Sequence, residues 1–239
     1  MKKGTIIIAL LCAVLLLQGC MYPSSQKAEN EIPYDEQIQV VQRAVDAFQE
    51  ESGGLLPIKT MEESTPIYQK YLIDFSKLKP RYMDQLPGNA FENGGVFQYL
   101  LLDVEEDPSV HIFDLRIAEE IRSLQIRIQA NRGIPFDKAL GGNKFTIDYS
   151  KLGYKEEPTV QSPYTNKELP LIAGGDGTIH VDYITDLYQF VQENNIDLND
   201  YKGNEQDILT VLHEESYFVP AYSPQYEVNE ENEIIYSSN

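Results

Sequence analysis

The hexapeptide Ile73-Asp74-Phe75-Ser76-Lys77-Leu78 returns later in the chain as Ile147-Asp148-Tyr149-Ser150-Lys151-Leu152. The features around the two copies follow one order: an amphipathic helix, a glycine and proline turn, the hexapeptide, a proline-rich loop, paired glycines and a strand. The spacing is longer than the unit of common solenoid repeats, so it favours two tandem modules over a repeat array. The order predicts an internal duplication, with chance similarity as the alternative.

Each module is expected to open with a helix. Apolar residues recur every three or four positions over 34–52, and Gly53-Gly54 follow as a stop signal. A second stretch with the same period begins after Asp114, which can cap a helix, and runs to Asn131. The apolar positions are Ile38, Val41, Val45 and Phe48 in the first helix and Ile117, Ile121, Leu124 and Ile128 in the second.

Strands are expected after the paired glycines. Residues 96–102 and 110–113 are apolar runs that can pair, and residues 179–183 alternate between apolar and polar side chains. Gly174-Gly175-Asp176-Gly177 is predicted to be a hairpin turn with positive φ rather than a phosphate loop, because a strand and not a helix follows it.

These patterns predict an α+β fold of two tandem small modules, each a helix packed on a short antiparallel sheet, after a lipoprotein signal peptide. Near the C-terminus, Tyr217-Phe218-Val219-Pro220 is expected to dock on the protein and the last residues are expected to fray. The expected parts are a signal peptide (1–19), a lipidated cysteine and flexible tether (20–33), a first module (34–113), a second module (114–183), and C-terminal helices with an extended acidic tail (184–239).

The N-terminus carries an export signal. Lys2 and Lys3 precede an apolar run of about a dozen residues, fewer than the roughly 20 that span a bilayer. The tetrapeptide Leu17-Gln18-Gly19-Cys20 resembles the bacterial lipobox. This resemblance implies a diacylglyceryl group on Cys20, whose two acyl chains, such as palmitate, anchor the protein to the extracytoplasmic face of the cell membrane. An ordinary cleaved signal peptide with a stray cysteine is the alternative.

The amino-acid composition limits the classes of molecule that the protein is expected to bind. The chain has 38 acidic and 19 basic residues and a formal charge of −19, which argues against binding to nucleic acid. With Cys12 removed in the leader and Cys20 lipidated, no thiol remains for a disulfide. Sixteen tyrosines and no tryptophan point to a tyrosine-rich core. We also name a speculative binding face of Tyr82, Tyr99, Tyr154 and Tyr164.

No constellation of residues indicates catalysis, a metal site or a cofactor. His111, His180 and His213 lie in separate predicted elements, and no second histidine follows His213 at the spacing of a zinc-binding helix. Asp74 and Asp148 could form a matched carboxylate pair, but an aspartate that caps the turn begun by the following serine is the simpler interpretation. The sequence also lacks a nucleophile elbow and a Walker loop.

Two resemblances bear on the fold. The predicted helix over 38–48, the turn at 53–57, the segment 82–87, and Gly95 with 97–101 look like the globular half of a type II secretion pseudopilin, which implies a helix on a small antiparallel sheet. The chain departs from that family by its lipobox and by the lack of a long N-terminal helix. The stretches Gly53-Gly54-Leu55-Leu56-Pro57-Ile58-Lys59-Thr60 and Gly94-Gly95-Val96-Phe97-Gln98-Tyr99, with the lipobox, resemble Bacillus-type lipoproteins of the YphF kind. That resemblance implies a lipoprotein and no chemistry.

Three functions are consistent with this sequence. The leading one is a non-enzymatic, membrane-anchored binding or assembly module whose partner is an envelope protein or wall polymer. The second is the solute-binding lipoprotein of a transporter, which would need a deep tyrosine-lined pocket with a charged anchor. The third is an envelope hydrolase that uses two carboxylates about 5 to 9.5 Å apart.

Overall fold

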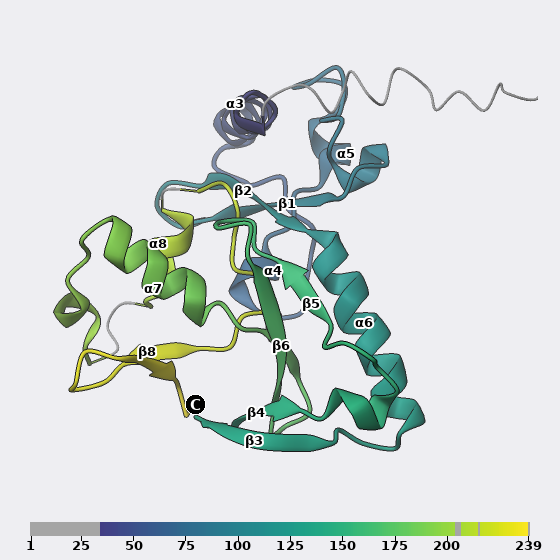
Figure 1. Cartoon of the computed structure of the whole chain (residues 1–239). Helices are drawn as coiled ribbons and strands as arrows, with labels where there is room; N and C mark the ends of the chain where they lie inside the picture. The colour runs from purple at the N-terminus through teal and green to yellow at the C-terminus, as the bar shows by residue number, and fades with distance from the viewer. Residues whose placement is uncertain (1–33, 204–206, 215, 239) are drawn as a thin grey trace, which may run out of the picture.

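Strand β1 is buried on both of its faces. The computed structural model describes residues 34–203, 207–214 and 216–238 (Figure 1). All six residues of β1 are buried, and β1 pairs antiparallel with β2 from Phe97 opposite Asp114 to Leu102 opposite Ser109. Tyr99 and Leu101 pack with helix α3, whereas Leu100 and Leu102 belong to the core on the other side. A mostly apolar run, here interrupted only by the buried Gln98, is the pattern expected of a strand covered on both faces.

The described helices and strands give an α+β fold with helices packed on small antiparallel sheets, as predicted. No helix in the described part of the chain has both the length and the apolar character to cross a bilayer. In chain order the elements are α3 (Tyr34–Ser52), α4 (Ile67–Lys70), α5 (Phe75–Leu78), η1 (Phe91–Asn93), β1 (Phe97–Leu102), β2 (Ser109–Asp114), α6 (Leu115–Ala130), β3 (Phe136–Gly141), β4 (Lys144–Ile147), η2 (Tyr149–Leu152), β5 (Thr159–Gln161), β6 (Glu168–Gly174), β7 (Ile179–Val181), α7 (Ile184–Glu193), η3 (Leu198–Tyr201), α8 (Thr210–His213), β8 (Tyr226–Val228) and β9 (Ile234–Tyr236).

Both copies of the hexapeptide sit at the same place in a sheet. In the first, Ile58 bridges Ile73 and Leu72 bridges Leu100 of β1, and β1 pairs with β2. In the second, β3 pairs with β4, β4 with β6, and β6 with β7. All of these neighbours are antiparallel and follow the same order, although the first sheet has only isolated bridges beside β1 and β2, and the second also has β5 paired with β6. This correspondence supports the predicted duplication.

The turn that carries each copy is built in the same way. The amide of Asp74 donates to the carbonyl of Pro57 over 2.7 Å, and the amide of Asp148 donates to the carbonyl of Pro135 over 2.8 Å. Asp74 then accepts hydrogen bonds from the amide and hydroxyl of Ser76, at 3.1 and 2.6 Å. Asp148 accepts from the hydroxyl of Ser150 at 2.5 Å. Each aspartate therefore stabilises the turn in which it lies through hydrogen bonds to the serine two residues later.

Four strands of the second sheet, β3, β4, β5 and β6, were not expected from the sequence. Strand β3 consists entirely of exposed residues, so it lacks the apolar alternation that marks a half-buried strand. Strand β6 lies in the stretch predicted as a proline-rich loop. Pro170 fits within β6 because its carbonyl accepts a hydrogen bond from Asp182 at 3.0 Å, although it has no amide to donate. Gly177, with φ of 90°, supplies the predicted positive φ in the β6–β7 turn.

The described C-terminal residues form a hairpin, although the sequence predicted that the last residues would fray. Residues 226–236 form the hairpin β8–β9, with Tyr226, Ile234 and Tyr236 buried. The hydroxyls of Tyr226 and Tyr236 both donate to the carboxylate of Asp182, at 2.9 and 2.7 Å. The correction has a physical reason: a buried carboxylate needs hydrogen-bond donors, and these two tyrosines supply them.

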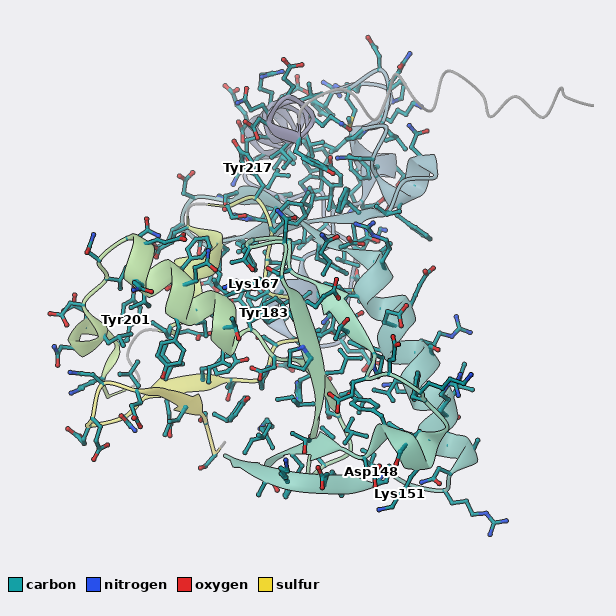
Figure 2. The ribbon with its side chains drawn as sticks, viewed as in Figure 1. Asp148, Lys151, Lys167, Tyr183, Tyr201 and Tyr217 are labelled. Carbon is teal, nitrogen blue, oxygen red and sulfur yellow. The ribbon has the colours of Figure 1, made fainter. Side chains whose placement is uncertain are left out.

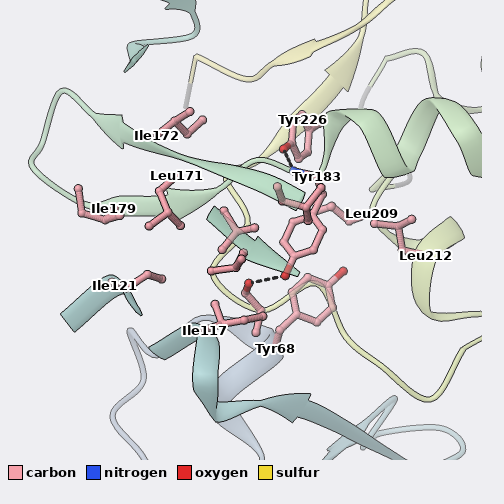
Figure 3. Close-up of a cluster of buried hydrophobic side chains, with 14 of the residues drawn as sticks. Tyr68, Ile117, Ile121, Leu171, Ile172, Ile179, Tyr183, Leu209, Leu212 and Tyr226 are labelled. Atoms are coloured by element: carbon pink, nitrogen blue, oxygen red, sulfur yellow. Dashed lines mark hydrogen bonds between the residues drawn. The ribbon is translucent and has the colours of Figure 1, made fainter. Parts of the chain in front are cut away.

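Tyr183 also forms hydrogen bonds inside the larger hydrophobic core. Figure 3 shows Tyr183 among the aliphatic side chains of α6 and β6, with its amide bonded to Tyr226 and its hydroxyl bonded to the backbone. The hydroxyl donates to the carbonyl of Ala221 at 3.0 Å. The predicted tyrosine-rich core is therefore present, with each of these hydroxyls paired. Residues 217–219 also dock as expected, because Phe218 bridges Ile112 in parallel.

Candidate functional site

Two adjoining cavities lie where the first sheet meets helix α8. The larger has a volume of about 740 Å³ and is lined by α3, β2, α8 and the segment that follows α8. The smaller, about 440 Å³, is lined by α4, the loop after β1, and α8. Asp103, Thr210 and His213 line both cavities. We call the two together the cleft.

Two histidines that are far apart in the sequence meet in the cleft. His111 comes from β2 and His213 from α8, and their ring centroids are 5.8 Å apart in an edge-to-face arrangement. Tyr68 contacts His213 in the same manner at 5.6 Å. The sequence gives no sign of this meeting, because about a hundred residues separate the histidines and no spacing motif links them.

Both imidazoles are held in the neutral form. Burial and the neighbouring His213 lower the pKa of His111 to about 4, and burial lowers the pKa of His213. Asp103 opposes both shifts through its negative charge. At neutral pH the cleft therefore presents two uncharged rings rather than two cations.

One polar atom of the pair has no partner. His111 is 8% exposed, and its Nε2 lies 3.2 Å from the hydroxyl of Ser109. Its Nδ1 is buried and forms no hydrogen bond with any described residue. The carbonyls of Ser216 and Tyr217 favour the charged ring, but neither forms a hydrogen bond of normal geometry with Nδ1. A buried polar atom without a partner is costly, but Nδ1 is closed to solvent, so it is not itself an open binding atom of the cavity.

The described residues of the cleft do not form a complete catalytic triad or a metal-ligand cluster. Ser109 and His111 resemble the first two members of a hydrolytic triad, but a third group that would orient the ring through Nδ1 is missing among the described residues. No group of three or more histidine, cysteine or acidic side chains in the described ranges is placed to hold a metal ion. The cleft therefore offers hydrogen-bonding and charged groups around a volume that fits a small ligand.

The four tyrosines named from the sequence do not form one face. Tyr99 is fully buried and donates to Asn89 at 2.7 Å, so its side chain belongs to the core and not to a surface. Tyr164 donates to the carbonyl of Phe218 at 3.2 Å. Tyr82 donates to Glu51 at 2.9 Å, and Tyr154 packs under Arg127 at 4.3 Å. None of the four lines the cleft.

The carboxylates of the two hexapeptides also stay apart. Asp148 pairs with Lys151 at 2.9 Å and lines a different cavity, of about 400 Å³, which Asp74 does not line. Bonds to Ser150 and Lys151 lower the pKa of Asp148 to about 2. Figure 2 shows Asp148 and Lys151 at the opposite end of the molecule from Tyr217, which lines the cleft. The proposed lipidation residue Cys20 lies outside the described residues.

Comparison with known proteins places the cleft at the border of a known domain. Residues 34–114 match the YphF family N-terminal domain, which spans α3 through β2 and includes His111. No curated protein matches the chain, and no solved structure matches it either. The likeness to pseudopilins stays a prediction. Residues 34–114 are thus similar to the YphF family N-terminal domain, and they are followed by a second sheet and by a C-terminal segment that lines the cleft.

Proposed function

We propose that this protein is a lipid-anchored, extracytoplasmic binding module of the cell membrane, without catalytic activity, and that its ligand occupies the cleft. The lipobox around Cys20 supports the anchor and the location. The cavity of about 740 Å³ beside the buried pair of His111 and His213 is the observation that carries the binding role. An envelope protein or wall polymer is the partner class expected for an assembly role.

The anchor can be tested with the chain's own two cysteines. Replacing Cys20 by serine should abolish incorporation of labelled fatty acid and release the protein from sedimented membranes. The matched control Cys12→Ser changes a cysteine inside the apolar run and should leave both properties intact. Label that persists in the Cys20→Ser protein would refute the lipid anchor.

The cleft can be tested by a ligand screen read through thermal stability. A ligand that binds the folded protein raises its melting temperature in proportion to the logarithm of the ligand concentration. A His111→Leu protein should lose the increase, whereas a His180→Leu protein should keep it, because His180 does not line the cleft. A ligand that stabilises all three proteins equally would bind elsewhere and would contradict the proposal.

A solute-binding role beside a transporter is the second candidate. The cleft has the features that such a role requires, because Tyr68, Tyr71 and Tyr217 line it together with Asp103. Cross-linking in membranes separates the two candidates. Capture of a transporter subunit favours solute delivery, and capture of a wall or envelope component favours assembly.

A further inference from the structure

Apolar side chains gather around Phe97, at the start of β1. The ring of Phe97 lies 5.4 Å from the ring of Tyr34 and 5.6 Å from that of Phe218, and both contacts are edge to face. The backbone of Phe97 bridges Ala90, which directly precedes Phe91 of η1. Four parts of the chain therefore meet at one residue: α3, η1, β1 and the segment after α8.

Several of these side chains are open to solvent. Phe91 is 58% exposed, Tyr34 is 48% exposed, and Val96, which directly precedes Phe97, is 39% exposed. Phe218 is half-buried. We call Tyr34, Phe91, Val96 and Phe218 the apolar face. A single exposed apolar residue needs no explanation, whereas a group of them around one common contact marks an interaction surface.

Charge does not account for what this surface binds. Arg116 interacts with Tyr34, but its guanidinium is already paired with Asp114. Asp35 and Glu36, in the first turn of α3, take part in none of the ion pairs found among the described residues. A strongly anionic partner would be repelled by these two carboxylates, so apolar contact has to drive any association.

The described structure begins at the apolar face. Residues 21–33 separate Tyr34 from Cys20, and a fully extended chain of that length reaches at most about 50 Å. Every other described residue is connected to Cys20 through Tyr34. Figure 1 shows α3 at one end of the molecule and β3 at the opposite end. A lipid on Cys20 would therefore hold the end with the apolar face nearest to the bilayer.

We infer that the apolar face rests on the surface of the bilayer that holds the lipid anchor, with Tyr34, Phe91 and Val96 at the boundary between head groups and acyl chains. Tyrosine is favoured at this boundary because its ring is apolar and its hydroxyl is polar. The lipid supplies the affinity, and the apolar face fixes which end of the protein points toward the membrane. This inference rests on the proposed function, because it needs the anchor.

The absence of tryptophan from the chain allows a direct test, because a single introduced tryptophan reports on its own position alone. Val96→Trp is the probe, and Leu140→Trp in β3 is the matched control, since the native side chains are 39% and 36% exposed. Each protein is purified with its lipid and reconstituted into phosphatidylcholine vesicles, with or without bromine on the acyl chains. Bromine quenches tryptophan fluorescence on contact. We expect brominated lipid to lower the emission of the Val96→Trp protein by about twofold or more, and to leave that of the Leu140→Trp protein almost unchanged.

A second substitution tests whether the apolar face itself makes the contact. In the Val96→Trp protein, Phe91→Ser should remove at least half of the quenching. Phe136→Ser removes a ring of similar exposure, 43%, from β3 and should leave the quenching unchanged. If the Val96→Trp protein does not fold, Phe91→Trp becomes the probe and Tyr34→Ser the second substitution.

Four outcomes would overturn the inference. Equal quenching of the Val96→Trp and Leu140→Trp proteins would show that no fixed end faces the membrane. Emission of the Val96→Trp protein that shifts to shorter wavelength without quenching would show that a protein, such as a second copy of the chain, covers the apolar face. If neither protein is quenched although both carry fatty acid and sediment with the vesicles, the anchor stands and the contact is wrong. If neither sediments, the proposed anchor fails and the inference fails with it.

Discussion

The two copies of the hexapeptide lie in sheets of the same strand order but in opposite surroundings. The first sheet contains β1, which is buried on both faces, and the second contains β3, which is exposed along its whole length. Each copy also has one histidine in its last strand, His111 opposite Leu100 and His180 opposite Ile172. Only His111 faces the cleft. The repeated local sequence is thus associated with the same turn and the same order of pairing. The rest of the chain determines which strands of each sheet are buried.

The largest expected effect is a difference in the free energy of unfolding between a substitution in buried β1 and one in exposed β3. Leu101→Ala in β1 should lower the free energy of unfolding by about 2–5 kcal/mol, because Leu101 is fully buried and the cavity left behind cannot collapse. Leu140→Ala in β3 should cost less than about 1 kcal/mol, because Leu140 is 36% exposed. Urea denaturation followed by circular dichroism measures both. Equal losses would contradict the contrast between the two sheets.

The second prediction uses the two histidines and concerns pH. The pKa of His111 is about 4 in the folded protein against 6.5 for an unperturbed histidine, so the unfolded chain takes up the proton first as pH falls. The stability from the neutral ring is complete above pH 6.5 and is lost progressively down to about pH 4, by up to about 3 kcal/mol. His111→Leu should remove most of this loss, whereas His180→Leu should remove less. A pH profile that both variants leave unchanged would sink the prediction.

The smallest expected effect distinguishes the two turns. Asp74→Ala should cost about 1 kcal/mol, because Asp74 accepts the amide of Ser76 at the start of α5. Asp148 accepts a hydrogen bond from the hydroxyl of Ser150 and forms an ion pair with Lys151, but its side chain forms no capping hydrogen bond at the start of η2. Asp148→Ala should therefore lower the unfolding midpoint less than Asp74→Ala does. The reverse order in parallel melts would show that the turns are not built as described.

Much of the fold could be predicted wherever a local pattern reports on burial. The helix over 34–52 was expected from its apolar spacing, and the strand near 97–102 was expected from its mostly apolar run, because each pattern follows from what the element buries. The cap at Asp114 was expected as well, and its carboxylate accepts the amide of Arg116 at 2.9 Å. These signals lie within one element and need no knowledge of its neighbours.

The elements that were missed depend on distant partners. Strand β3 has no buried face and therefore no alternation of apolar and polar residues. Pro170 argues against a strand in the sequence, but β6 tolerates it because only the carbonyl of Pro170 forms a hydrogen bond there. The hairpin after Tyr226 looked like a frayed tail because Asp182, which binds its tyrosines, lies more than forty residues earlier. The cleft was missed for the same reason, since His111 and His213 meet only through the fold.

The backbone pairing between Ile112 and residues 217–219 has a consequence for how the chain matures. Ile112 donates to the carbonyl of Tyr217 at 2.8 Å and accepts from the amide of Val219 at 3.1 Å, so the outer edge of β2 stays unpaired until the ribosome has made residue 219. A chain that is made from its N-terminus therefore has an open strand edge for the time needed to synthesise about a hundred residues. During that interval the open edge of β2 can pair with another extended chain, so a chain that lacks residues 217–219 should aggregate more readily than the complete fold.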